Sequence, residues 1–135
     1  MKAVILAGGL GTRLKPFTEV IPKPLLPIGE KAVLEIQIEH LKRHGFNDIV
    51  LATNYRSDYI EKFFGDGSRY GVTLTISKEE QSLGTAGPVS LLRSGLTDPF
   101  IVMNGDILSS IDFTAFYTYA LSRQALLPLA IKKFI

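Results

Sequence analysis

The amino-acid sequence predicts a single α/β domain with a mostly parallel β-sheet flanked by helices. Two observations support this prediction. Short apolar runs alternate along the chain with segments of helical periodicity, which is the pattern of strands joined by crossover helices. The chain has 135 residues, of which 46% are hydrophobic and 21% are charged. That length is enough for one hydrophobic core and too short for two ordinary domains.

The expected strands are four apolar runs and one weaker run. Residues 2–7 and 49–53 are strongly apolar, as strands buried on both faces are. Residues 72–77 alternate apolar and polar side chains, which places this strand near an edge of the sheet. Residues 100–103 are the fourth expected strand. Residues 126–132 are a fifth, although a proline interrupts them.

Helices are expected between these strands. Apolar residues at i, i+4 and i+7 predict a helix over residues 30–44, which a glycine ends. Shorter helices are expected over residues 58–64, 84–95 and 112–122, and the last begins with an aspartate suited to cap it. Three glycines near the start of residues 8–29, and four prolines within them, exclude a regular helix there and predict a long loop.

Composition excludes several classes of function. The absence of cysteine excludes a disulfide framework, a thiolate zinc site and a cysteine nucleophile. No apolar run has the length of a signal-peptide core or a membrane span, so we expect a soluble, cytoplasmic protein without a membrane partner. Residues 1–31 carry five basic and two acidic side chains, whereas the rest carries ten and eleven. This small excess suits a phosphate ester and is too weak for nucleic acid.

A glycine-rich segment directly follows the first expected strand. Gly8, Gly9 and Gly11 offer backbone N–H groups with little side-chain obstruction, and Arg13 adds a planar guanidinium that suits phosphate oxygens. A tight strand-exit turn is the alternative interpretation. Thr12 and Arg13 after Gly11 exclude the phosphate-binding loop of P-loop NTPases. The proline-rich continuation disfavours a dinucleotide fingerprint, which opens a helix directly.

Two charged residues further along the chain are candidates for phosphate chemistry. Lys23 lies between Pro22 and Pro24, which predicts an extended backbone and a restricted direction for its ammonium group. Asp106 follows an apolar strand and a glycine, where a carboxylate would hold Mg²⁺ through one oxygen. The alternatives are a solvated lysine and an ordinary turn residue.

Five motifs together resemble one known family. The segments GGLGTRL, PKPLLPI, GDGSRYGV, LGTAG and NGD occur in this order up to about Asp112. The chain thereby resembles the N-terminal part of the sugar-1-phosphate nucleotidyltransferases, also called nucleotide-sugar pyrophosphorylases. The resemblance implies a Rossmann-like, GT-A-like nucleotidyltransferase fold that is incomplete at its C-terminal end, because the family's catalytic domain continues further.

The resemblance also implies a reaction and its residues. An NTP and a sugar-1-phosphate would give an NDP-sugar and pyrophosphate with Mg²⁺, and LGTAG resembles the branch that uses GTP and mannose-like phosphates. Arg13 would hold the leaving pyrophosphate, Lys23 would neutralise the reacting phosphates and Asp106 would carry the metal. The residues implied for nucleotide binding are Leu6, Ala7, Gly8, Gly9, Gly11, Thr12, Gln81, Gly84 and Thr85.

The family comparison leaves two functions open. In the family, the later half of the domain supplies a second metal carboxylate, another phosphate-binding lysine and most of the sugar pocket. Residues 1–135 are therefore expected to form a single nucleotide-binding domain without that sugar-binding part. The chain is then either a working nucleotidyltransferase, alone or as a dimer, or a nucleotide-binding module or fragment that does not turn over. An unfinished sheet edge predicts a homo-oligomer.

Overall fold

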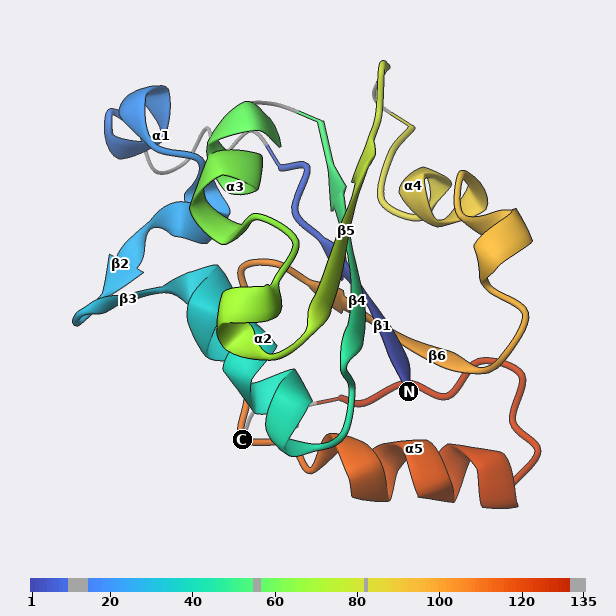
Figure 1. Ribbon diagram of the computed structural model, residues 1–135. Coiled ribbons are helices and arrows are strands. Elements are labelled where there is room, and N and C mark those ends of the chain that lie inside the picture. The colour runs from blue at the N-terminus through green and yellow to red at the C-terminus, as the bar shows by residue number, and fades with distance from the viewer. Residues whose placement is uncertain (10–14, 55–56, 82, 132–135) are drawn as a thin grey trace.

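A parallel four-stranded β-sheet forms the centre of the computed structural model, which describes residues 1–9, 15–54, 57–81 and 83–131 (Figure 1). Within these ranges the strand order is β5-β4-β1-β6. The strands are β1 (Lys2–Leu6), β4 (Asp48–Thr53), β5 (Thr73–Lys78) and β6 (Phe100–Asn104). The predicted α/β class is confirmed, and so is the place of residues 72–77 at an edge.

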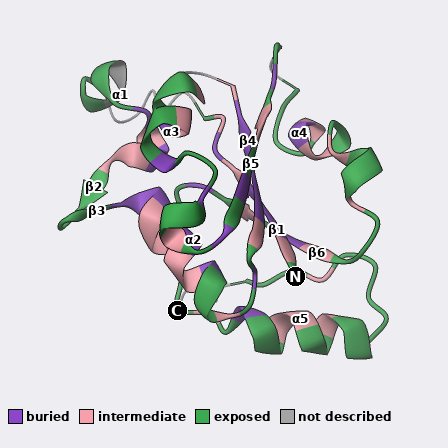
Figure 2. Ribbon diagram, viewed as in Figure 1, coloured by how far each residue is buried: buried purple, intermediate pink, exposed green. Residues whose placement is uncertain are grey.

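The first strand is central because it is apolar on both faces. β1 pairs in parallel with β4, with Val4 opposite Val50, and with β6, with Val4 opposite Val102. Ala3, Val4 and Ile5 are all fully buried, and the middle of the sheet is the most buried part of the molecule (Figure 2). Strands buried on both faces are typical of parallel sheets covered by helices.

Helices cover the two faces of the sheet unequally. The larger core lies between the sheet and α2 (Val33–Arg43), α3 (Ser57–Phe64) and α5 (Phe113–Ser122). On α2, Leu34, Ile38 and Leu41 are fully buried, and each contributes about 1.5–3 kcal/mol through the hydrophobic effect.

The opposite face carries less cover. It packs its smaller cluster, which includes Val4 and Val50, against Leu92 and Leu96 from the segment that contains α4 (Gly87–Ser90) and η4 (Arg93–Gly95). Figure 1 shows α4 across the sheet from α2 and α3.

The helix over residues 112–122 begins as the sequence predicts. The Asp112 carboxylate accepts a hydrogen bond from the Ala115 backbone N–H at 2.8 Å, which satisfies one free donor of the first turn of α5. Phe113 is buried beside Phe46, with the ring centroids 6.3 Å apart. The cap and this aromatic contact fix α5 beneath the larger core.

Several predictions about local structure were wrong, beginning with the long loop. Residues 8–29 contain the one-turn helix α1 (Phe17–Val20), the 3₁₀ turn η2 (Lys23–Leu25) and β2 (Pro27–Ile28), which pairs with β3 (Lys31–Ala32). A single turn fits between prolines because its hydrogen bonds do not reach a proline nitrogen. The helix expected over residues 30–44 therefore begins three residues late, at Val33.

The helix expected over residues 84–95 is broken into α4 and η4. Turn residues separate the two pieces, and the second closes with a single-turn hydrogen bond from the Gly95 N–H to the Leu92 carbonyl at 2.9 Å. Glycine and serine near its end lower the helix propensity of this stretch. Residues 84–95 therefore help to cover one face of the sheet without forming one continuous helix.

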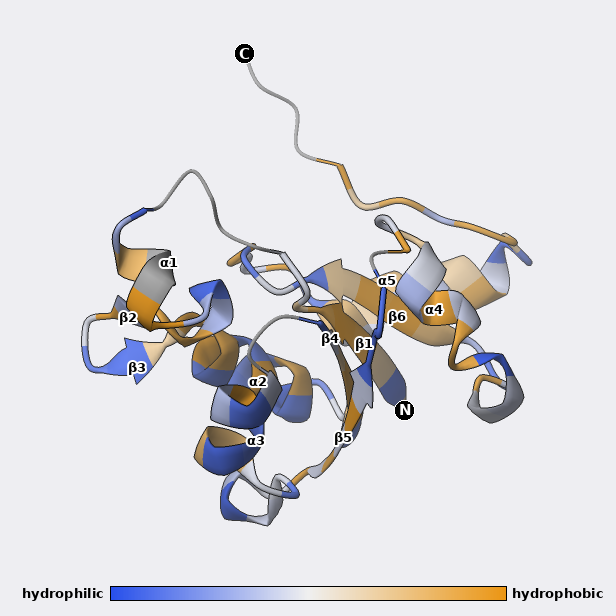
Figure 3. Cartoon of the chain, turned by 90° about the horizontal axis from the view of Figure 1, so that it is seen from above, coloured by the Kyte–Doolittle hydropathy of each residue, from blue (hydrophilic) through white to orange (hydrophobic). Residues whose placement is uncertain are grey.

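The strand expected over residues 126–132 is absent from residues 126–131, the described part of that range. Leu126, Leu127, Leu129 and Ile131 are 74–103% exposed, and Figure 3 shows this stretch as a hydrophobic extension leaving the body beyond α5. Apolar composition alone cannot make a strand without a partner for its backbone groups. In the described part of the chain no helix is long and apolar enough to cross a membrane.

Candidate active site

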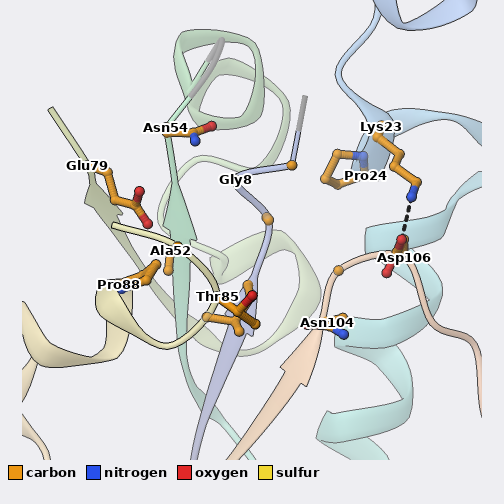
Figure 4. Close-up of a pocket in the computed structure, with 15 residues that line it drawn as sticks. Gly8, Lys23, Pro24, Ala52, Asn54, Glu79, Thr85, Pro88, Asn104 and Asp106 are labelled. Carbon is orange, nitrogen blue, oxygen red and sulfur yellow. Dashed lines mark hydrogen bonds and ion pairs between the residues drawn. The ribbon is translucent and has the colours of Figure 1, made fainter. Parts of the chain in front are cut away.

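An open cleft of about 660 Å³ lies at the carboxyl ends of the strands, which is where ligands gather in parallel α/β sheets (Figure 4). The ends of β1, β4 and β6, the residue after β5, η2, and α4 with the segment before it contribute to the cleft. The lining residues are Leu6, Ala7, Gly8, Gly9, Lys23, Pro24, Ala52, Asn54, Glu79, Gly84, Thr85, Pro88, Asn104, Gly105 and Asp106.

Most of the sequence-predicted site residues that the structure describes line this cleft. Leu6, Ala7, Gly8, Gly9, Lys23, Gly84, Thr85 and Asp106 are among the lining residues. Gln81 is exposed and is not one of them. Gly11, Thr12 and Arg13 lie outside the described residues, so their predicted roles stay predictions.

The exit of β1 brings bare backbone to the cleft. The Ala7 N–H donates to the Ala52 carbonyl at 2.8 Å, which extends the pairing of β1 and β4 by one residue. A Cβ on Gly8 would lie 3.2–3.3 Å from the side-chain atoms of Asn54. Gly8 therefore leaves room for the Asn54 carboxamide, which Figure 4 shows beside it. A Cβ on Gly9 would meet no atom within 4 Å, so a ligand can approach the backbone closely at Gly9.

Lys23 is held by its two neighbouring prolines. Pro22 and Pro24 are buried, and the Leu25 N–H donates to the Pro22 carbonyl at 2.9 Å. The backbone at Lys23 is thus a 3₁₀ turn, and the extended backbone predicted from the sequence was wrong, because this hydrogen bond closes the turn. The lysine side chain reaches across to Asp106 and donates to its Oδ2.

Asp106 lies in a turn that is packed tightly against β1. The Gly105 N–H donates to the Leu6 carbonyl at 2.8 Å. A Cβ on Gly105 would lie 3.1 Å from the Leu6 carbonyl oxygen and 3.3 Å from the Ala7 Cα, closer than side chains ordinarily come. A glycine at this position is what lets the turn lie so near the strand.

The ion pair of Lys23 and Asp106 is accessible to solvent. The two side chains are 30% and 41% exposed. Pairs with this much solvent contact contribute only about 0.2–1 kcal/mol to stability. A polyanionic ligand can therefore draw the ammonium away from the carboxylate at little cost to the fold.

Glu79 is a site residue that the sequence reasoning missed. It follows β5, is only 9% exposed, and lines the cleft. Its Oε2 accepts from the Leu83 N–H at 3.3 Å, and its own N–H donates to the Thr53 carbonyl at 2.8 Å. The rule that ligands gather at the carboxyl ends of strands applied equally to β5 and would have found it.

The order of the strands spreads the polar groups along the cleft. Glu79 follows β5, Asn54 follows β4, Gly8 follows β1 and Asp106 follows β6. Figure 4 shows Glu79 on one side of Gly8 and the Lys23–Asp106 pair on the other. Three strand spacings separate β5 from β6, which is about 14 Å. The cleft therefore has one anionic end, a bare backbone centre and one end with paired charges.

The carboxylate of Asp106 suits a magnesium ion that takes most of its other ligands from water and phosphate. It is exposed enough to accept a hydrated ion. Among the described residues no group of three or more His, Cys, Asp or Glu could hold a metal by itself. A protein-enclosed zinc or calcium site is thus not formed there, whereas a one-carboxylate magnesium site fits.

The parallel sheet makes this an α/β protein, and the open cleft at its strand ends holds a placed lysine and the carboxylates of Asp106 and Glu79. Comparison with known sequences gives the family. Residues 2–133 match the family described as nucleotidyl transferase, and the chain belongs to this family.

Curated relatives with similar sequences carry guanylyltransferase names. The chain is 46% identical over 118 residues to probable mannose-1-phosphate guanylyltransferase 1 of Oryza sativa subsp. japonica, covering 84% of this chain and 33% of the relative. It is 44% identical over 117 residues to the mannose-1-phosphate guanylyltransferase catalytic subunit beta of Xenopus tropicalis, with 84% and 32% covered. The chain thus spans about one third of the length of these relatives.

Solved structures confirm the predicted nucleotidyltransferase fold over about half of their length. A putative glucose-1-phosphate thymidylyltransferase from Bacillus anthracis, solved in complex with a sucrose, superposes with a TM-score of 0.81 at 31% identity, covering 93% of this chain and 51% of that one. HddC from Yersinia pseudotuberculosis, complexed with GMP-PN, superposes with a TM-score of 0.79 at 35% identity, covering 89% and 54%.

Proposed function

We propose that this chain binds a nucleoside triphosphate in the cleft for transfer of its nucleotidyl group to a sugar-1-phosphate. The observation that carries the proposal is the meeting of Lys23 and Asp106 beside the bare backbone at Gly8 and Gly9. A cation, a metal-binding carboxylate and free backbone donors at one strand edge suit a triphosphate.

This transfer depends on positive charges and hydrogen-bond donors held near the phosphates more than on proton transfer. An oxygen of the sugar phosphate attacks the α-phosphorus of the NTP, the bond to the β-phosphate breaks, and pyrophosphate leaves with the electron pair. The attacking oxygen is already ionised at neutral pH, so no general base is needed. The difficulty is to bring two polyanions together and to stabilise the charge that moves onto pyrophosphate.

The chain's own residues address that difficulty in separate ways. The Lys23 ammonium, released from Asp106, would neutralise phosphate oxygens, and the backbone of Gly8 and Gly9 would lie against the nucleotide. Arg13 keeps its proposed role at the leaving pyrophosphate. Asp106 would hold Mg²⁺, which supplies neutralising charge and alignment of the phosphate oxygens when bound.

The nucleobase that suits the other end of the cleft is guanine. The Glu79 carboxylate offers two acceptor oxygens, and guanine presents two adjacent donors, N1–H and the N2 amino group. Uracil and thymine offer a single N–H between two carbonyl acceptors, which a carboxylate repels. We therefore propose GTP as the nucleotide, with Gly84 and Thr85 lining the same region. The structure with GMP-PN bound, cited above, is consistent with this proposal.

A mannose-like 1-phosphate is the proposed second substrate, on the strength of the names of the relatives. Among the described residues none after Asp106 lines the cleft. The described side chains therefore form the nucleotide-binding part of the proposed site, and they do not enclose a pocket for the sugar. We expect strong effects of Mg²⁺ on GTP binding and low turnover with sugar-1-phosphates.

Titration calorimetry and a pyrophosphate-release assay test the proposal together. The chain is titrated with GTP, ATP, UTP and dTTP, with and without Mg²⁺, and is then assayed with mannose-1-phosphate and glucose-1-phosphate. The proposal expects GTP binding that Mg²⁺ strengthens. Binding without pyrophosphate release identifies a nucleotide-binding module, and release identifies a working enzyme. No binding of any NTP overturns the proposal.

Asp106→Asn supplies the matched control for the metal. The carboxamide keeps the size of the side chain and can still accept a hydrogen bond from Lys23, but it is a poor magnesium ligand. We expect the variant to keep its thermal stability and to lose the Mg²⁺-dependent gain in GTP affinity. An unchanged response to Mg²⁺ would show that Asp106 is only a turn residue.

We also propose self-association through the outer side of β6. In the described residues this strand pairs with β1 and has no neighbour on its other side. Val102 on it is 43% exposed, and unpaired strand edges favour association. Light scattering after gel filtration should show a dimer or larger species for the chain and less of it for Val102→Lys. A monomeric parent chain contradicts this part of the proposal.

A further inference from the structure

The side chain of Gln37 connects helix α2 to the turn that carries Asp106. Gln37 is only 2% exposed, and its Nε2 donates to the Asn104 carbonyl at 2.9 Å and to the Ile107 carbonyl at 2.7 Å. These acceptors are 67 and 70 residues away in the sequence. Because both neighbours are carbonyl oxygens, only the amino end of the carboxamide can face them.

The two acceptors of Gln37 enclose Asp106. Asn104 lies two residues before it and Ile107 one residue after it, so the bonds hold both ends of the turn. On the other side of the turn, the Gly105 N–H donates to the Leu6 carbonyl at 2.8 Å. The turn is therefore clamped between β1 and α2, and the place of the Asp106 carboxylate is set by both.

Burying the Gln37 carboxamide destabilises the fold, and its hydrogen bonds to the turn account for a glutamine at this position. Its Oε1 is buried and has no hydrogen-bond partner. A buried polar atom without a partner is destabilising, so an apolar side chain would serve this position of α2 better if packing were its only use. Neighbouring buried positions of the helix, such as Leu34 and Ile38, are apolar. The two bonds to the turn are thus the specific use of this carboxamide.

We propose that Gln37 is a positioning residue that fixes the Asp106 carboxylate for Mg²⁺ and nucleotide phosphate. The inference rests on the proposed function, because it assigns Gln37 to the same site. Gln37 is not among the residues that line the cleft; it acts through the main chain of residues 104–107. Without the two N–H donors of Gln37 the turn is no longer fixed, so the Asp106 carboxylate is not held in position. A higher Mg²⁺ concentration is then needed for the same gain in GTP affinity.

The test measures, for the parent chain and for each variant, the Mg²⁺ concentration that gives half of the maximal gain in GTP affinity. Gln37→Met keeps the length of the side chain and removes both donors. Gln37→Glu keeps its shape, but an ionised carboxylate would face two carbonyl oxygens. Ile38→Val is the matched control, because it trims a fully buried side chain on the same helix and leaves both hydrogen bonds in place.

The expected result is a selective change in the metal requirement. Both Gln37 variants should need at least about fivefold more Mg²⁺, while GTP affinity without Mg²⁺ stays within about twofold of the parent chain. Ile38→Val should lower the melting temperature and leave the Mg²⁺ requirement unchanged. An unchanged requirement in Gln37→Met, or an equal loss of affinity with and without Mg²⁺, would overturn the inference.

A measurement on the unmutated chain covers the case in which the variants do not fold. The side-chain amide resonances of Gln37 in ¹⁵N NMR spectra should exchange slowly with solvent and shift when Mg²⁺ is added with GTP. Resonances that exchange rapidly or do not shift would overturn the inference alone. A parent chain without Mg²⁺-dependent GTP binding would overturn the proposed function, and this inference with it.

Discussion

The Lys23 ammonium donates a hydrogen bond to Oδ2 of Asp106, although the two residues are 83 positions apart in the sequence. Lys23 comes from η2, and Asp106 comes from the turn after β6. The contact places the cation proposed to bind phosphate directly on the carboxylate proposed to bind the metal. Triphosphate and Mg²⁺ would separate the two groups, each taking the one of opposite charge.

Replacing Lys23 should affect binding far more than folding. Lys23→Met removes an ion pair whose side chains are 30% and 41% exposed, so unfolding free energy should fall by less than about 1 kcal/mol. Loss of a charge-assisted bond to phosphate, worth roughly 1.5–3 kcal/mol, should weaken GTP binding by about 10- to 150-fold. Urea denaturation and calorimetry measure the two quantities.

The control for Lys23 is another lysine in a surface ion pair. Lys31 pairs with Glu39 at 2.7 Å, away from the cleft lining. Lys31→Met should therefore leave GTP affinity unchanged. Equal losses of affinity in the two variants would mean that Lys23 acts only through the net charge of the chain.

Glu79→Gln should change the choice of nucleobase. A carboxamide presents one acceptor and one donor in place of two acceptors, so it no longer matches the paired donors of guanine. GTP affinity should fall by about tenfold or more, whereas UTP should bind as well as before or better. Competition binding of the four NTPs measures this ratio. A fall in affinity for all four bases alike would assign Glu79 to the fold of the cleft wall.

A methyl group at Gly105 should displace the turn that carries Asp106. The Cβ would lie 3.1 Å from the Leu6 carbonyl oxygen, and this backbone cannot give way without disturbing β1. Gly105→Ala should cost about 1–3 kcal/mol in unfolding free energy and should weaken the Mg²⁺ response. Gly95→Ala is the control, since a Cβ there meets no atom within 4 Å. Similar stability of the two variants in denaturation would contradict the tight packing of the turn.

Acid should destabilise the fold through His40. Burial lowers the pKa of His40 below its ordinary value of 6.5, and the positive charges of His44 and Arg43 lower it further. Backbone hydrogen bonds at Ser109 and Ile111 act in the opposite direction, to a smaller extent. The unfolded chain therefore binds this proton at a higher pH than the folded chain does. The resulting stability is complete above about pH 6.5 and is lost as the pH falls.

His40→Gln isolates this effect. The ring of His40 lies 4.9 Å from that of Phe113, so the variant loses some packing at every pH. Its loss of unfolding free energy between pH 7.5 and 5.5 should nevertheless be smaller than that of the parent chain. Urea denaturation at the two pH values measures both losses, and equal losses would show that His40 does not carry the effect.

Local pattern was sufficient to predict the four strands of the main sheet and to propose several of the residues that line the cleft. Continuous apolar runs identified β1, β4 and β6, and alternating polarity placed β5 at an edge. A strand buried on both faces is apolar throughout, whereas a strand buried on one face alternates apolar and polar side chains. Gly8, Lys23 and Asp106 could be proposed because each follows a strand end or lies between prolines. Sequence reasoning failed where a local signal depended on a distant partner. The apolar stretch of residues 126–131 looks like a strand and has no strand beside it in the described structure.

By itself, the sequence determined the α/β class, the parallel strands and the chemical types of the cleft residues, since these depend on periodicity and on neighbours along the chain. Only the tertiary structure decided that Lys23 meets Asp106, that Glu79 and not Gln81 lines the cleft, and that Gln37 holds the turn at residues 104–107. The physical reason is that strand order, β5-β4-β1-β6, brings together groups that are far apart in sequence. Side-chain polarity specifies which strands are buried, but the contacts between their ends arise from the packing of the whole sheet and its helices.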